Sequence, residues 1–272
     1  FGPILLSATP VPAVEVARPM RLRALFAGSP LGTVGIFLLG SVYATQSGMG
    51  AVFGTQIGLT AAQIALFVAM LFAGALVLQY PIGWLSDRMD RRKLIFGAAT
   101  LGATACMLGW LIGDAHRPLM AAAFFAGGVT TPLYALFLAY TNDFLSAEDM
   151  PAASGGLVFT FGLGAIAGPL VTGWAMQGLG PFAFWLVLGA TFGAIALYAL
   201  YRMTQRPVVP VEETESYLGV LPTASPIAVE AAGAWAAEQA EAGREAEAER
   251  EAEAEREAER EAEAEREAGS KP

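Results

Sequence analysis

The stretch from Gly83 to Lys93 packs six charged side chains into a short break between two long apolar runs: Asp87, Arg88, Asp90, Arg91, Arg92 and Lys93. A carboxylate at a helix end can accept hydrogen bonds from the exposed N–H groups at the N-terminus of a neighbouring helix, where the helix dipole favours negative charge. Asp87 is placed for such a contact. This spacing is typical of a cytoplasmic loop between membrane helices.

A second group of polar side chains lies inside the apolar runs, where burying a polar group without a partner is costly. Tyr43, Gln46 and Ser47 share one helical face, and three further members surround Pro132: Thr130, Thr131 and Tyr134. Substrate binding and interhelical hydrogen bonding are both open as the role of these groups. In a transporter, they are the candidates for a substrate pathway.

Long apolar segments must position both groups. The 272 residues are 55% hydrophobic and include one cysteine, Cys106, which excludes disulfides and cysteine-rich metal sites. Six runs approach the ~20 residues that a helix needs to cross a bilayer. We expect transmembrane helices at residues 30–53, 61–85, 94–113, 118–140, 153–175 and 181–203.

Local signals mark several of these helix ends. Thr60 and Gln63 form a capping box before the second span, and Ser29 precedes a first-turn proline. Four tryptophans near span ends predict an aromatic belt: Trp84, Trp110, Trp174 and Trp185.

The basic residues in and around the predicted spans fall almost entirely on one side of the membrane, and only Arg117 lies on the other side. The residues on the first side are Arg18, Arg21, Arg23, Arg88, Arg91, Arg92, Lys93, Arg202 and Arg206. Because basic loops stay in the cytoplasm, we expect a multi-pass protein of the plasma (inner) membrane with both ends of this segment cytoplasmic.

The pattern G-x-L-S-D-R-x-D-R-R-K resembles the signature loop of the major facilitator superfamily of secondary transporters, which lies between the second and third helix of each six-helix half. The family usually has a glycine where this chain has Asp90. The run from Ala139 to Asp143, followed by Met150 and Ser154-Gly155-Gly156, is similar to a bacterial branch called YcaD-like.

The resemblance implies an all-α membrane protein that forms the C-terminal half of this fold. Residues 1–29 would end a central cytoplasmic loop, and residues 30–203 would be family helices 7 to 12. Residues 204–237 would be a disordered cytoplasmic linker. The Ala/Glu/Arg-rich tail at 238–272 would be a solvated helix or disordered.

The resemblance also implies a conformational latch. In the family, the carboxylate that matches Asp87 bridges the two halves and releases during the transport cycle, and Arg91 matches a basic residue that pairs with an acid two helices later. Asp143 is the candidate partner. The expected latch residues are Gly83, Asp87, Arg88, Arg91, Arg92 and Asp143. The alternative, that the arginines only set orientation, stays open.

The fifth span predicts close helix packing. Gly164 and Gly168 form a small-xxx-small face, and Pro169 frees a backbone carbonyl and can kink the helix. The run resembles the Gly-Pro motif of the superfamily's antiporters, which belongs to the first half, so antiport stays open.

The resulting functional expectation is secondary active transport of a small solute by alternating access. The alternative is a six-span channel or scaffold. We expect no enzyme, because an intramembrane serine protease needs a histidine near Ser154 and His116 lies at the opposite face.

We expect no cofactor and no metal. Proton or ion coupling stays open, because no Asp, Glu, Lys, Arg or His falls inside a predicted span apart from Arg202 at the end of the sixth. The expected partners are the lipid bilayer, a missing N-terminal six-helix half and an unknown small-molecule substrate, with no nucleic acid.

Overall fold

The computed structural model describes residues 22–113, 115–145 and 150–205, and within these ranges the chain forms helices and no strands. The elements are α2 (Leu22–Gly28), α3 (Pro30–Ala44), the π-helical turn η1 (Thr45–Met49), α4 (Gly50–Gln56), α5 (Ala61–Ser86), α6 (Arg91–Ile112), α7 (His116–Asn142), α8 (Met150–Leu179) and α9 (Ala183–Met203).

Six of the helical segments are long and apolar enough to cross a membrane, which confirms the predicted fold class. The first of them, Pro30–Gln56, is α3, η1 and α4 in continuous succession. The predicted linker at 204–237, apart from its first two residues, and the tail at 238–272 lie outside the described residues, as do residues 1–21 of the predicted loop.

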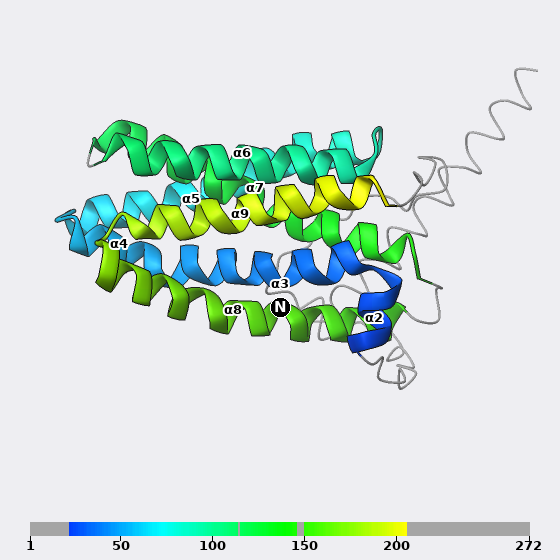
Figure 1. Cartoon of the computed structure of the whole chain (residues 1–272). Helices are drawn as coiled ribbons and strands as arrows, with labels where there is room; N and C mark the ends of the chain where they lie inside the picture. The colour runs from blue at the N-terminus through cyan, green and yellow to red at the C-terminus, as the bar shows by residue number, and fades with distance from the viewer. Residues whose placement is uncertain (1–21, 114, 146–149, 206–272) are drawn as a thin grey trace, which may run out of the picture.

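The six spans lie side by side with their axes roughly parallel (Figure 1). Helix α7 is the central one: 83% of its most apolar stretch is buried, against 22% for α5 and 33% for α8. It packs against α5, α6 and α3, while α3 also packs on α8 and α6 on α9. Helices α5 and α8 therefore present the most open faces of the bundle.

Glycines allow the closest helix contacts. A Cβ atom at Gly164 of α8 would overlap the Phe37 carbonyl oxygen, and one at Gly168 would overlap Ser41. On the other side of α7, Gly74 of α5 lies against the carbonyl group of Phe124. Pro169 lies inside α8, which continues to Leu179.

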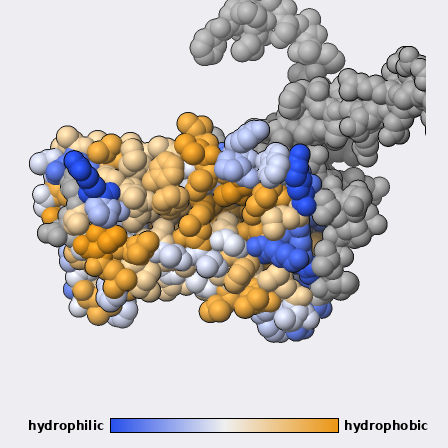
Figure 2. All heavy atoms as spheres, turned by 90° about the horizontal axis from the view of Figure 1, so that it is seen from above, coloured by the Kyte–Doolittle hydropathy of each residue, from blue (hydrophilic) through white to orange (hydrophobic). Residues whose placement is uncertain are grey.

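Polar and apolar residues separate along the bundle. Figure 2 shows hydrophilic residues gathered at both ends of one face and mainly hydrophobic residues between them, as expected for a membrane protein. Trp84, Trp110 and Trp174 are exposed near span ends, but Trp185 is fully buried. The aromatic-belt prediction is therefore wrong for Trp185, which packs in a ring cluster with Phe53, Phe67 and Phe184.

Two further helix-end predictions have different outcomes. The Thr60 side chain accepts a hydrogen bond from the Gln63 N–H, and the Gln63 side chain accepts one from the Thr60 N–H, so the capping box is confirmed. Ser29 precedes Pro30 as predicted, but its hydroxyl makes no cap bond. Instead, it donates to the Thr141 hydroxyl at 3.4 Å and ties the start of α3 to the end of α7.

Candidate functional site

The turn between α5 and α6 is built around Asp90. Its side chain accepts from the Arg92 N–H at 2.9 Å and so caps α6. The carboxylate also binds the Arg92 guanidinium, at 3.1 Å from Nε and 3.0 Å from Nη2. Asp90 has φ of −53° and ψ of 114°. The turn therefore does not require glycine at this position, and the aspartate provides the helix cap.

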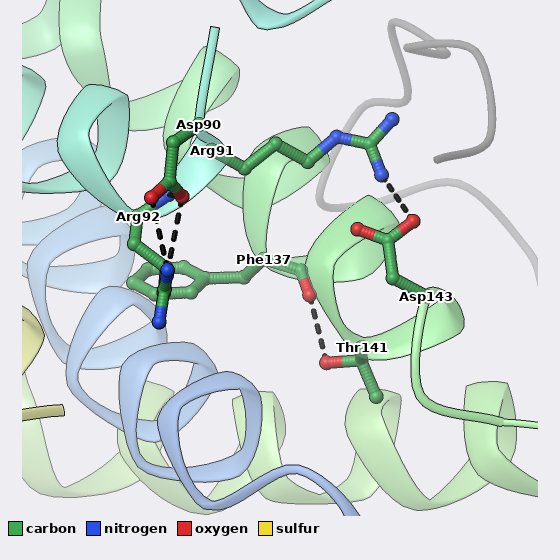
Figure 3. A network of polar contacts seen from close by, with 6 residues as sticks. All are labelled: Asp90, Arg91, Arg92, Phe137, Thr141 and Asp143. Carbon is green, nitrogen blue, oxygen red and sulfur yellow. Dashed lines mark hydrogen bonds and ion pairs between the residues drawn. The ribbon is translucent and has the colours of Figure 1, made fainter. Parts of the chain in front are cut away.

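Arg91 and Asp143 form an ion pair between the start of α6 and the end of α7 (Figure 3). Each side chain is only 3% exposed. Among the described residues, Nε and Nη2 of Arg91 are buried without a hydrogen-bond partner. The Asp143 carboxylate is thus the acceptor that compensates the burial of this guanidinium, which makes the contact sensitive to the loss of either residue.

The other expected latch residues lie at the same end of the bundle in separate contacts. The Arg88 guanidinium lies 4.3 Å from the ring centroid of Trp84, one turn earlier, and donates to the Trp84 carbonyl at 3.1 Å. Gly83 is buried, and Asp87 is exposed at the C-terminal end of α5. The predicted latch residues therefore share one end of the bundle and form several local contacts.

A pocket opens among α3, η1, α5 and α7. It is lined by Tyr43, Gln46, Ser47, Leu71, Phe72, Ala75, Gly127, Thr130 and Thr131. Five of the six residues expected along a substrate pathway thus meet in one pocket, near the middle of their spans. The lining contains hydroxyl and amide groups beside apolar side chains, and no charged residue.

Gln46 connects the pocket walls. Its Nε2 donates to the Ala126 carbonyl at 3.2 Å. The Thr130 hydroxyl, a single donor, lies 3.0 Å from both Gln46 Oε1 and the Ala126 carbonyl oxygen. Both side chains are buried. Ser47, which is exposed, donates to the Tyr43 carbonyl at 2.7 Å. The Gln46 amide and the Ser47 hydroxyl are thus both paired within the bundle.

Tyr134, the sixth expected residue, does not line this pocket. It is 2% exposed and its ring packs edge-on against Phe161, with the ring centroids 5.4 Å apart. Tyr134 therefore lies outside this pocket, and its role along a substrate pathway stays a prediction. Phe161 of α8 also packs against the ring of Tyr43, with the ring centroids 5.7 Å apart.

Sequence reasoning missed the π-helical turn η1, although its residues Thr45–Met49 include two that line the pocket. Ser, Thr and Gly are weak helix formers, and the run Thr-Gln-Ser-Gly is the signal that could have drawn attention to this turn.

Comparison with known proteins identifies relatives of this fold. Residues 31–239 match the family model described as Major Facilitator Superfamily. The chain is 26% identical over 142 residues to the uncharacterized MFS-type transporter YfkF of Bacillus subtilis, covering 52% of this chain and 36% of the relative. It is 25% identical over 181 residues to the uncharacterized MFS-type transporter YcaD of Escherichia fergusonii, covering 66% and 46%.

Among solved structures, the bundle is similar to an auto-inhibited POT family peptide transporter. The TM-score is 0.57 at 15% sequence identity, over 67% of this chain and 38% of the other. This likeness shows the fold alone. The chain spans between about a third and a half of the length of the curated relatives it matches.

Proposed function

Because this chain belongs to the Major Facilitator Superfamily, we propose that it forms one half of a secondary active transporter that moves a small solute by alternating access. The chain is an integral membrane protein with six helices able to span the bilayer. A membrane transport role fits its relatives, which are MFS-type transporters.

The observation that carries the proposal is the pocket at Tyr43, Gln46 and Thr130. Hydrogen-bonding groups at mid-depth in an otherwise apolar bundle are suited to a polar solute that has left water. Transporters of this architecture bind substrate near the bilayer midplane between two repeats. The pocket supports the same placement here.

The face of α5 beside the pocket supports the second half as a partner. Phe72 lines the pocket and is 52% exposed, and Leu76 and Tyr80 on the same helical stripe are 79% and 80% exposed. We propose that a second six-helix half covers this stripe and closes the pocket.

We propose that the Arg91–Asp143 pair acts as a latch at the cytoplasmic end. A buried ion pair that joins two helix ends has two discrete arrangements, closed and solvated, which is what a conformational switch needs. The predominance of basic residues at this end supports its cytoplasmic orientation.

Cysteine labelling in the intact gene product tests this proposal. With Cys106→Ala as background, Ser47→Cys places a thiol at the exposed edge of the pocket. We expect a membrane-impermeant maleimide to label this thiol from either side of the membrane, because alternating access opens the pocket to each side in turn. The measurement is the labelling rate in right-side-out and inside-out vesicles.

Two exposed positions at opposite ends of the bundle provide the controls. Ala115→Cys should be labelled only from outside and Gln205→Cys only from inside. If these two react from the reverse sides, the orientation is wrong. If Ser47→Cys reacts from one side only while both controls behave as expected, alternating access at this pocket is contradicted.

A further inference from the structure

The π-helical turn η1 connects the pocket to a second feature of the bundle. Tyr43, at the end of α3, and Gln46 and Ser47, within η1, line the pocket. The helix α4 that follows carries Phe53, which is fully buried in an aromatic cluster. Any change in η1 must therefore move α4 relative to the pocket, because the two are parts of one continuous span.

Hydrogen bonds hold η1 from two neighbouring helices. Gln46 binds α7 twice, through the Ala126 carbonyl and the Thr130 hydroxyl. Thr45, the residue before it, lies 3.3 Å from Thr172 of α8, hydroxyl to hydroxyl. A π turn adds one residue to a helical turn and is usually seen as a single insertion that neighbouring contacts maintain.

Phe53 connects α4 to the aromatic cluster through direct ring contacts. Its ring stacks on Phe184 at a centroid distance of 4.9 Å and an interplanar angle of 11°. It also meets the Trp185 ring edge-on at 5.9 Å. Phe184 and Trp185 belong to α9, so the cluster joins α4 to the last span.

We propose that η1 is a switch whose π form is held by the Gln46–Thr130 hydrogen bond. A ligand in the pocket that binds the Gln46 amide replaces Thr130 as its partner, and the turn then becomes α-helical. Because each α-helical residue turns the chain by about 100°, this change rotates α4 by roughly that angle and withdraws Phe53 from Trp185. The ligand part of this proposal rests on the proposed transport function.

The test uses the intact gene product with Trp185 as its sole tryptophan, every other tryptophan of the protein, including the other four of this chain, being replaced by phenylalanine. Thr130→Val and Gln46→Met each remove the holding hydrogen bond and keep the side-chain size close to the original. We expect each to shift the equilibrium toward the α form by roughly fivefold or more. The readout is a red shift of Trp185 emission and faster quenching of it by iodide.

A matched control removes a comparable hydroxyl elsewhere. Thr160 is also buried and donates to a carbonyl one turn earlier in its own helix, but it lies on α8. Thr160→Val should leave Trp185 emission unchanged. An equal shift in this control would show that the signal reports general loosening, and it would overturn the proposal.

Deletion of Gly48 gives the decisive second variant. Gly48 is exposed, has no atom of another segment within 4 Å of its added Cβ, and lies inside η1. Removing one residue turns the π turn into an α turn while α4 keeps its phase. In this background Thr130→Val should no longer move Trp185 emission. A shift that persists after the deletion, or no shift with Gly48 present, overturns the proposal.

This experiment uses no substrate. Failure of the fluorescence test therefore rejects the switch alone, whereas failure of two-sided labelling at Ser47 rejects the alternating-access function.

Discussion

Replacing Arg91 by alanine is expected to lower the free energy of unfolding of the intact protein by about 3–5 kcal/mol, the usual range for breaking a buried ion pair. Asp143→Ala should have a similar effect, because it leaves the 3% exposed guanidinium without its carboxylate. Both changes should also loosen the end of the bundle at which α6 begins and α7 ends. Unfolding in mild detergent, followed by intrinsic fluorescence, measures the loss.

The exposed Arg88 is the matched control, since it belongs to the same loop and stacks on Trp84. Arg88→Ala should leave the unfolding midpoint nearly unchanged. The charge-swapped double variant, Arg91→Asp with Asp143→Arg, should be more stable than either of its single variants and should preserve transport. A double variant no better than the single variants would show that the pair is not an energetic unit.

Gly164→Ala is expected to destabilise the bundle by about 1–3 kcal/mol, as overpacking does. The added methyl group would overlap the Phe37 carbonyl, which belongs to helical backbone and cannot move aside alone. Helices α3 and α8 would have to separate. Because α3 carries Tyr43 and continues directly into η1, which carries Gln46, the pocket would be disturbed as well.

Gly162→Ala provides a comparison within the same helix. No neighbouring atom lies within 4 Å of a Cβ added at Gly162, so this change should stabilise the helix by about 0.5–1 kcal/mol through backbone entropy and helix propensity. The two substitutions should thus have opposite signs in the same unfolding assay. Equal effects would mean that α3 and α8 do not approach as closely as the structure places them.

The sequence-based predictions succeeded where one local rule decides the structure. Apolar length fixed the six spans, and the Thr60–Gln63 spacing fixed a helix start. Helical period placed Tyr43, Gln46 and Ser47 on one face, and these three residues meet in the pocket.

The predictions failed where packing between helices decides. Trp185 lies near a span end, which favours the membrane interface, yet three aromatic rings from three helices enclose it in the core. The turn η1 depends on contacts of Thr45 and Gln46 with α8 and α7, which no local pattern contains.

Solute flux tests the central claim most directly. The intact gene product, reconstituted into proteoliposomes, is given a panel of small uncharged and charged solutes, with and without an imposed proton or sodium gradient. We expect saturable accumulation of at least one solute against its own gradient, with a KM that Tyr43→Phe or Gln46→Met raises. Solutes that only equilibrate without saturation would indicate a channel, and no flux of any solute in protein that labels correctly at Ala115→Cys and Gln205→Cys would contradict a transport function for this bundle.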